Sequence, residues 1–251
     1  MKTLVLSKEM LHSGDLILVN RQHPYYEYND TPLISVQERK SSVLLRRNVV
    51  ALLSKLMEKM SGWQSIVPVS GWRSMQEQQD IWDQSLEENG LAFTETYVAV
   101  PGHSEHQTGL AIDLGLMKPD IDFIRPDFPY SGICQQFRNK APEYGFIERY
   151  PEGKESVTGI GHEPWHFRYV GVPHAVIMQE QGMVLEEYIE FLKQYPYGEK
   201  PYLYRSKGYD FKVSYLKAED KDKIRLIPDS EHPCLVSGNN MDGFIITEIM
   251  R

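Results

Sequence analysis

The 251-residue sequence predicts an α+β protein that ends in a small β-rich appendage. Two observations predict this class. The expected strands and helices do not alternate with the regularity of a doubly wound parallel sheet. After Tyr195 the chain also changes to short β-prone runs separated by Gly, Asn and Asp turns. Hydrophobic residues make up 41% of the chain, which is enough for a proper core.

The first expected strand spans residues 16–20 (LILVN). A helix is expected over residues 41–60 because apolar residues recur there at helical spacing, and Gly62 ends it. The next β-prone run, SIVPVSGWR, ends in a turn at Ser70 and Gly71. The apolar positions of the expected helix are Leu45, Val49, Leu52, Leu53, Leu56 and Met60.

A second helix is expected from Ser74 to about residue 89. Ser74 and Glu77 have the spacing of a capping box, in which each side chain satisfies a free backbone N–H of the first turn. A third helix is expected over residues 133–140, and a fourth over residues 174–194 with a bend near Gly182. We expect residues 1–197 to form one large domain and residues 198–251 to form a small extension of unassigned role.

The overall charge argues against one class of partner. The chain carries 27 Lys and Arg against 35 Asp and Glu, a formal net charge of −8. Proteins that bind nucleic acids normally present a basic face to the phosphate backbone, so we expect no nucleic-acid partner.

The cysteines and the N-terminus suggest where the protein works. Cys134 and Cys234 are too few and too far apart for a disulfide framework, which favours a reducing compartment. The apolar run at the N-terminus is short and is interrupted by Ser7, Lys8 and Glu9, so we expect neither a signal peptide nor a membrane segment. A cytoplasmic protein is therefore expected.

The segment GLAIDLG (109–115) predicts a strand that exposes a carboxylate on one face. Its period-2 alternation puts Leu and Ile side chains on the core face. Asp113 lies on the opposite face between Ala111 and Gly115, the two smallest side chains, which leave space around it. His106 precedes this strand in a glycine-bounded loop.

A second segment, HEPWHFRYV, predicts another strand with a histidine on one face. Pro164 disfavours a helix and pushes Glu163 toward an extended conformation. The strand continues from Trp165 and alternates, with His166 on the side opposite Trp165. If the two strands are neighbours, His166 points into the same space as Asp113.

Two imidazoles and one carboxylate form a donor set that suits Zn²⁺, and three protein ligands leave a fourth position for water. A structural zinc site more often has four ligands rich in cysteine. Glu163 is close to His166 in the chain and is better suited to take a proton from a zinc-activated water than to bind the metal. Taken singly, each histidine could also be a hydrogen-bonded core residue, and Asp113 a turn or cap residue.

Several motifs together resemble those of the zinc D,D-peptidases that include the vancomycin-resistance VanX and VanY enzymes. They are SGWRS (70–74), SEHQTGLAID (104–113) and EPWH (163–166), within a resemblance over about residues 40–195. The downstream segment 143–171 is most similar to the VanY and bifunctional VanXY branches. The resemblance implies an antiparallel central sheet flanked by helices, the fold of the Hedgehog and D,D-peptidase group.

The resemblance also implies the metal site and the base. It assigns His106, Asp113 and His166 as the ligands of one Zn²⁺ per chain and Glu163 as the catalytic base. Hydrolysis then begins when Glu163 accepts a proton from the zinc-activated water, and no side chain acts as a nucleophile.

Four more residues match positions with roles around the substrate. Arg73 is implied to polarise the scissile carbonyl and to stabilise the oxyanion, a role that suits a guanidinium fixed where a strand meets a helix. Ser104 and Gln78 are implied to line the substrate pocket, and Trp165 to wall it. From the residues alone, Arg73 could equally form a surface salt bridge.

The implied activity is hydrolysis of D-Ala-D-Ala and removal of the terminal D-Ala from peptidoglycan pentapeptide precursors, which would contribute to glycopeptide resistance. The expected partners are small peptides that end in D-Ala-D-Ala. The absence of an anchor favours the VanXY branch within the family. Two alternatives remain: an L,D-carboxypeptidase that acts on peptidoglycan tetrapeptides, and a non-catalytic zinc-bearing module that binds wall precursors.

Overall fold

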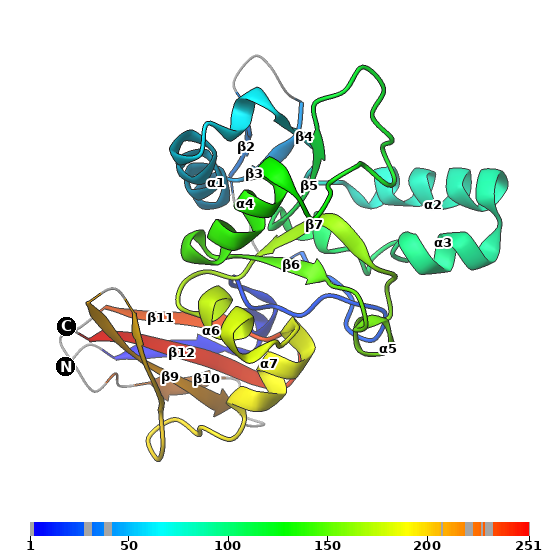
Figure 1. The fold of residues 1–251 in the computed structure, drawn as a ribbon. Helices are drawn as coiled ribbons and strands as arrows, with labels where there is room; N and C mark the ends of the chain where they lie inside the picture. Colours follow the sequence, from blue (N-terminus) through cyan, green and yellow to red (C-terminus); the bar gives the residue numbers. More distant parts are fainter. Residues whose placement is uncertain are drawn as a thin grey trace. The chain divides into compact units, whose positions relative to one another are not determined.

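Figure 1 shows the computed structural model, which describes residues 3–27, 32–37, 42–206, 208–218, 223–226, 228 and 233–250. The chain divides into two compact units. The large unit comprises Val19–Tyr25 and Asp30–Gln179, and the small unit comprises Met1–Leu18, Tyr26–Asn29 and Glu180–Arg251.

The large unit is built on an antiparallel four-stranded sheet, as the resemblance implied. Its strands are β4 (Ile66–Ser70), β5 (Ala111–Leu116), β7 (Glu163–Tyr169) and β6 (Phe146–Tyr150), and they lie in that order. Each neighbouring pair is antiparallel, and β5 and β7 occupy the centre. Both central strands therefore have a hydrogen-bonded neighbour at each edge.

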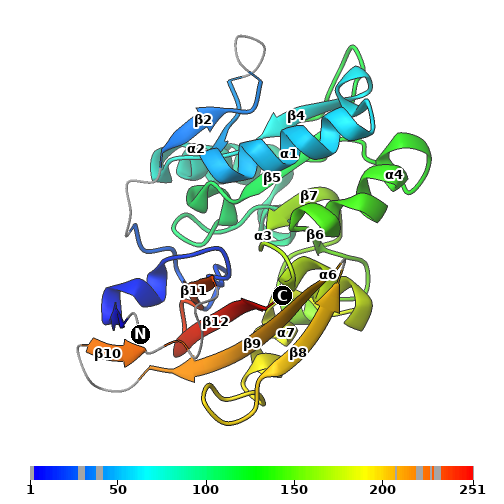
Figure 2. The same cartoon turned by 90° about the vertical axis from the view of Figure 1, so that its left-hand side faces the viewer.

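Helices flank this sheet. Figure 2 shows α1 (Arg47–Lys59) in front of β4 and β5, with α4 (Gly132–Lys140) beside it. Helix α1 presents an apolar stripe at helical spacing to the sheet. Helices α2 (Met75–Asn89) and α3 (Leu91–Tyr97) run side by side as a hairpin (Figure 1). The buried residues of α1 are Val49, Val50, Leu53, Leu56 and Met57.

Helix α2 begins as its sequence predicted. The Ser74 hydroxyl accepts a hydrogen bond from the Glu77 backbone N–H, and the Glu77 carboxylate accepts one from the Ser74 N–H, which completes the capping box. Helix α4 matches the expected third helix. The fourth expected helix is divided into α6 (His174–Gln181) and α7 (Leu185–Leu192), with the break at Gly182.

The expected helix over residues 41–60 is wrong at its start. Leu44–Arg46 forms strand β3, which pairs with β2 (Leu33–Ser35), and the helix begins only at Arg47; Ser41 lies outside the described residues. Leu45 is fully buried as a strand residue opposite Ile34. Its burial extended the apolar pattern of the helix toward the N-terminus, and so the pattern gave the wrong boundary.

The expected strand at residues 16–20 is also wrong. Residues 16–19 are buried, but the backbone groups of Leu16 and Leu18 bond to a turn and to side chains instead of forming a β ladder. The Leu16 N–H donates to Ser237 Oγ and the Leu18 N–H donates to the Asn239 carbonyl, while Asn240 Nδ2 donates to the Leu18 carbonyl. Apolar residues are therefore buried here without a β ladder. Strand β6 and helix α3 had no counterpart in the sequence prediction.

The small unit is mainly β, in agreement with the appendage predicted from the sequence. Its four-stranded antiparallel sheet has the order β11 (Cys234–Gly238), β12 (Gly243–Met250), β9 (Tyr209–Lys217) and β8 (Tyr202–Ser206). A second sheet pairs β1 (Leu4–Ser7) with β10 (Lys223–Leu226). The core is formed by Leu6, Leu226, Phe244 and Ile246.

The compact units differ from the predicted domain boundaries. The division falls at Glu180 and not at residue 197, and Met1–Leu18 belongs to the small unit. The pairing of β1 with β10 joins residues more than two hundred positions apart, which local patterns do not reveal. The functional division into residues 1–197 and 198–251 stays a prediction.

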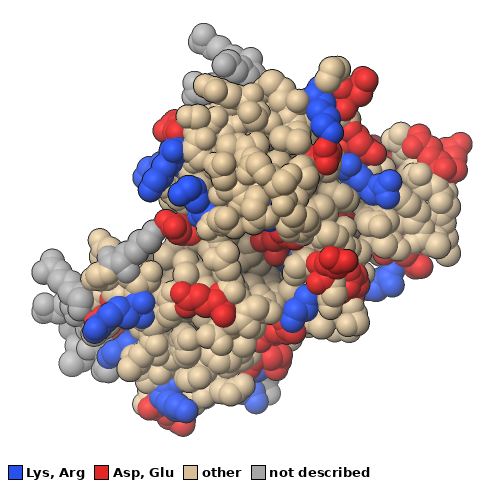
Figure 3. Space-filling view, viewed as in Figure 1, with Lys and Arg blue, Asp and Glu red and all other residues tan. Residues whose placement is uncertain are grey.

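Three further features concern the surface and the thiols. Acidic and basic side chains are interspersed over the face seen in Figure 3. Among the described residues, no helix is long and apolar enough to cross a membrane. Cys134 and Cys234 are both free thiols.

Candidate active site

The centre of the large unit brings together the side chains that the two strand motifs predicted. Asp113 on β5 pairs with His166 on β7, so both side chains lie on the same face of the sheet. Asp113 Oδ1 and His166 Nδ1 are 2.9 Å apart. Both residues are buried, with 4% and 3% of their surface exposed. The expected neighbourhood of the two strands is confirmed.

His106 reaches the same place from a tight turn before β5. The 3-10 helix η3 (Glu105–Thr108) is capped by Ser104, whose hydroxyl accepts from the His106 N–H, and it ends at Gly109 with φ of 68°. A left-handed backbone there favours glycine. His106 Nδ1 lies 2.6 Å from the Gly71 carbonyl, which can only accept, so Nδ1 carries the proton. Nε2 is then free to donate its lone pair and lies 3.2 Å from Asp113 Oδ2.

The space beside Asp113 is less open than the small neighbouring residues suggested. A Cβ at Gly115 would lie 3.2 Å from both Pro126 and Val69 side-chain atoms. The glycine therefore lets the loop that follows β5 approach the strand, and the open space lies over His106 and His166 instead.

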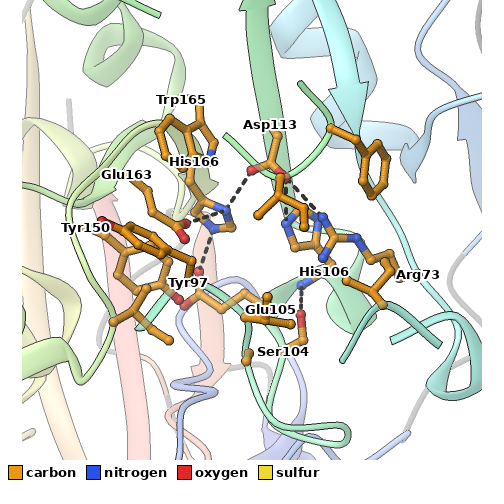
Figure 4. Close-up of a pocket in the computed structure, with 16 residues that line it drawn as sticks. Arg73, Tyr97, Ser104, Glu105, His106, Asp113, Tyr150, Glu163, Trp165 and His166 are labelled. Carbon is orange, nitrogen blue, oxygen red and sulfur yellow. Dashed lines mark hydrogen bonds and ion pairs between the residues drawn. The ribbon is translucent and has the colours of Figure 1, made fainter. Parts of the chain in front are cut away.

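These three side chains fit a divalent cation. One ligand atom from each of His106, Asp113 and His166 lies within 4.8 Å of the others, and all three residues are buried. Two imidazole nitrogens and a carboxylate oxygen are donors that zinc prefers. Figure 4 shows the three side chains converging at one wall of a pocket.

The protonation of the cluster also suits a cation. Burial, followed by the charge of Arg73, lowers the pKa of His106 to about 4, which keeps its imidazole neutral. Burial alone would raise the pKa of Asp113, but the two neighbouring imidazoles outweigh burial and lower it. Burial likewise opposes charge on His166, but the neighbouring carboxylates of Asp113 and Glu105 raise its pKa to about 9. A metal at Nδ1 of His166 would displace that proton.

Arg73 lies at the start of α2, as predicted, and its guanidinium is held by three groups. Nη2 donates to Asp113 Oδ2 at 3.1 Å, Nε donates to Ser70 Oγ at 2.9 Å, and Nη1 donates to Gln78 Oε1 at 3.3 Å. Burial lowers the pKa of Arg73, with Asp113 and Glu163 opposing that effect. The guanidinium lines the pocket beside the His–Asp–His cluster.

The residues predicted to line the pocket fall into two groups. Ser104 and Trp165 do line it. Gln78 does not: its side chain is fully buried, accepts from Arg73 and donates through Nε2 to the Ala99 carbonyl at 2.8 Å. Its amide groups are therefore committed to neighbouring protein atoms.

Glu163 is a buried carboxyl group on the pocket wall opposite Arg73 (Figure 4). Burial, reinforced by the nearby Asp113 carboxylate, raises the pKa of Glu163 to about 8. Its Oε2 lies 3.8 Å from His166 Nδ1, beyond hydrogen-bond distance. It is thus a carboxyl group beside the cluster that can hold or release a proton near neutral pH.

Other residues of this site were not indicated by the sequence motifs, among them one carboxylate and two tyrosines. Glu105 lines the pocket and its carboxylate faces His166, while Tyr97 and Tyr150 form aromatic walls. The Tyr150 ring lies 4.9 Å from the His166 ring. Glu105 stands between Ser104 and His106 in the sequence, and its position directly before a proposed ligand was a signal that could have been used.

The pocket itself is small and adjoins a wider groove. Its volume is about 40 Å³, room for about three water molecules. Tyr97 and Trp165 also line an open groove of about 460 Å³, together with residues 125–130, His162 and Pro164. A ligand bound at the His–Asp–His cluster could therefore extend into the groove past these two aromatic residues.

Comparison with known proteins agrees with this geometry. Residues 42–172 match the VanY family, described as D-alanyl-D-alanine carboxypeptidase. The bifunctional D-Ala-D-Ala dipeptidase and D-Ala-D-Ala carboxypeptidase VanXYC of Enterococcus gallinarum is 44% identical over 181 residues, which cover 71% of this chain and 95% of that relative.

Two solved structures are also similar. The vancomycin-resistance D,D-dipeptidase VanXYg, in complex with a D-Ala-D-Ala phosphinate analog, is 51% identical with a TM-score of 0.95, covering 99% of this chain and 98% of that one. A mutant of the D,D-pentapeptidase VanY from a VanB-type resistance cassette, in complex with Zn(II), is 34% identical with a TM-score of 0.58. The match covers 70% of this chain and 98% of that one. The resemblance read from the motifs is confirmed, and the chain belongs to the VanY family of D-alanyl-D-alanine carboxypeptidases.

Proposed function

We propose that this protein hydrolyses the D-Ala-D-Ala dipeptide, removes the terminal D-Ala from peptidoglycan pentapeptide precursors, and thereby contributes to glycopeptide resistance. One observation carries the proposal. A single pocket is lined by the His–Asp–His cluster, by a carboxyl group whose pKa is raised to about 8, and by a buried guanidinium. The names of the bifunctional VanXYC and of VanXYg support the same substrates for this chain.

In this proposal His106, Asp113 and His166 hold one zinc ion per chain. Bound zinc supplies Lewis-acid chemistry, which polarises a carbonyl group and makes water a stronger nucleophile at neutral pH. The Zn(II) complex of the related VanY supports this choice of metal.

Glu163 is proposed as the general base and then as the general acid. Its carboxylate accepts the proton of the attacking water and delivers it to the amine of the departing D-alanine. A carboxyl group is effective in both steps when its pKa lies near the working pH, a condition that its burial favours. Hydrolysis is the expected outcome because no side-chain nucleophile is needed.

Arg73 is proposed to stabilise the negative charge that develops on the carbonyl oxygen. Its three hydrogen bonds, to Ser70, Gln78 and Asp113, fix the guanidinium before substrate binds, which is the condition for effective electrostatic catalysis. We propose that Gln78 acts by holding Arg73, and that Ser104 and Trp165 contact the substrate.

The groove that adjoins the pocket provides room for a longer substrate. With the terminal dipeptide at the zinc site, the preceding residues of a pentapeptide precursor would lie between Tyr97 and Trp165. The expected cytoplasmic location, where this precursor and the free dipeptide are made, stays a prediction that fractionation of the source cells would check.

The test is D-alanine release by the purified, zinc-loaded protein from three substrates: D-Ala-D-Ala, a pentapeptide precursor ending in D-Ala-D-Ala, and an L,D-linked tetrapeptide. Glu163→Ala is measured beside the wild type, with its zinc content determined. We expect release from the first two substrates and its loss in the variant with zinc retained. Expression of the gene in a glycopeptide-sensitive host should also raise the inhibitory concentration of vancomycin.

The other outcomes identify the alternatives. Release from the tetrapeptide alone would replace the proposal with an L,D-carboxypeptidase. Zinc binding without release from any of the three substrates would leave a precursor-binding module. Full activity in Glu163→Ala would refute the proposed base.

A further inference from the structure

A buried carboxylate lies beside the imidazole of His166, on the side away from Asp113. Glu105 is 2% exposed, and its Oε1 accepts two hydrogen bonds of 2.8 Å, from Arg149 Nε on β6 and from Arg168 Nη1 on β7. Both arginines are fully buried. Two buried guanidiniums that donate to one carboxylate favour its charged form.

The second oxygen of this carboxylate faces the ring. Glu105 Oε2 lies 3.5 Å from His166 Nε2, and within the described part of the chain neither atom has a hydrogen-bond partner. Buried polar atoms without partners are uncommon and costly, and here one is an acceptor while the other becomes a donor when it carries a proton. Figure 4 marks this ion pair with a dashed line, and a small shift would bring the two atoms to the usual hydrogen-bond distance.

From this geometry we infer that Glu105 is a positioning residue for the zinc site: it accepts a hydrogen bond from His166 Nε2–H and so keeps Nδ1 unprotonated and directed at the metal. The inference rests on the zinc site of the proposed function. Nδ1 is the nitrogen directed at Asp113, at 2.9 Å. Imidazole has one proton when neutral, so fixing it on Nε2 frees Nδ1 to bind.

The two proposed histidine ligands are then oriented in matching ways by different acceptors. His106 is fixed through Nδ1 by the Gly71 carbonyl, which leaves Nε2 for the metal. His166 is fixed through Nε2 by a carboxylate, which leaves Nδ1. A carboxylate partner also makes the imidazole more basic and a stronger ligand than a carbonyl partner does.

Glu105→Gln is the informative variant because the arginines determine how the new side chain lies. Arg149 and Arg168 both donate toward the Oε1 position, so the amide oxygen must take that position. The amide NH₂ then faces His166 Nε2 and requires it to be an acceptor. The proton of His166 moves to Nδ1, which blocks the metal. Glu105→Ala is less useful because it would leave two buried guanidiniums without their carboxylate.

The measurement is the zinc Kd by competition with a chromophoric chelator, together with the visible spectrum of the cobalt(II)-substituted protein. For Glu105→Gln we expect a Kd about 10–100 times that of the wild type and an altered cobalt spectrum. The matched control is Glu148→Gln, which also removes a carboxylate paired with an arginine, here Arg138 Nε at 2.8 Å. Its zinc Kd should stay within about twofold of the wild-type value, since Glu148 pairs with Arg138 and not with a proposed zinc ligand.

One result would show that the role of Glu105 is purely structural. In that case Glu105→Gln would lower the melting temperature of the metal-free protein and leave the zinc Kd and the cobalt spectrum unchanged. An equal loss of affinity in Glu148→Gln would also overturn the inference. Wild-type protein that binds no zinc would instead refute the zinc site itself, which separates the two failures.

A second measurement needs no variant. In zinc-loaded, ¹⁵N-labelled wild type, long-range ¹H–¹⁵N spectra should show the proton of His166 on Nε2 and that of His106 on Nδ1. A proton on Nδ1 of His166 would overturn the inference even if Glu105→Gln failed to fold.

Discussion

Asp113 and His166 are directly opposite each other in the antiparallel pair β5–β7, with Oδ1 of the aspartate 2.9 Å from Nδ1 of the histidine. This register determines the site. A slip of one residue would turn the His166 side chain to the opposite face of the sheet, where Phe167 is buried. The pairing of these two strands is therefore as necessary to the proposed metal site as the ligands themselves.

The first prediction concerns Asp113. Asp113→Asn keeps the shape of the side chain but removes the negative charge that faces both imidazoles and Arg73. We expect a zinc Kd at least about 100-fold higher and loss of D-alanine release, since metal affinity depends on charged carboxylate ligands. Asp127→Asn, an exposed carboxylate paired with Lys118, is the control and should bind zinc normally. Zinc binding of wild-type strength in Asp113→Asn would remove it from the ligand set.

The second prediction concerns Arg73. Arg73→Lys keeps a positive charge but cannot make the three directed hydrogen bonds of the guanidinium. We expect kcat to fall by about 10²–10³ with a change in KM of only a few fold, because the lost interaction is made chiefly in the transition state. Steady-state kinetics on D-Ala-D-Ala check this. An unchanged kcat would contradict the proposed role.

Gln78 gives a related but smaller prediction. Gln78→Met retains the volume of a buried side chain and removes the amide that bonds Arg73 and the Ala99 carbonyl. We expect a fall in kcat smaller than that of Arg73→Lys, with little further loss when both substitutions are combined, because Gln78 acts through Arg73. Additive losses in the double variant would show that Gln78 acts independently.

The motifs predicted the centre of this site better than its surroundings. His106, Asp113 and His166 come together because period-2 alternation on β5 and β7 specifies the face of each side chain, and alternation is a strong local signal. The antiparallel pairing that joins them came from the family resemblance. The capping box at Ser74 likewise fixed the start of α2, and with it the place of Arg73.

The features of the fold and of the site that the sequence did not predict depend on contacts between residues far apart in the chain. The segment of residues 16–18 is buried against a turn near Asn239, and local hydrophobicity does not distinguish that from a strand. No local pattern singles out Glu105, since its partners Arg149 and Arg168 lie 44 and 63 residues away in the chain. Polar residues buried by long-range pairing carry little local signal.

The pH dependence of stability should reveal a buried histidine. His174, at the start of α6, is 6% exposed, and burial lowers its pKa to about 3. As the pH falls below about 6.5, the unfolded chain takes up a proton that the folded protein does not, so the free energy of unfolding falls, approaching about 1.4 kcal/mol per pH unit. His174→Gln should remove the contribution of His174 to the slope of the unfolding free energy against pH between pH 6 and pH 5, as measured by urea unfolding. An identical slope in the variant would contradict this assignment to His174.

Metal removal provides the last prediction, and it separates a ligand from a base. Zinc that binds only the folded protein should raise the free energy of unfolding by about 2.7 kcal/mol at a free concentration of 100 times Kd. A chelator should abolish both this gain and D-alanine release, and added zinc should restore both.

Glu163→Gln should keep the zinc-dependent rise in melting temperature and lose the release, since Glu163 is not among the three residues whose ligand atoms converge, His106, Asp113 and His166. Asp113→Asn should lose both. If Glu163→Gln lost the stabilisation as well, the carboxyl group of Glu163 would be a fourth ligand, and the base would have to be sought elsewhere in the pocket.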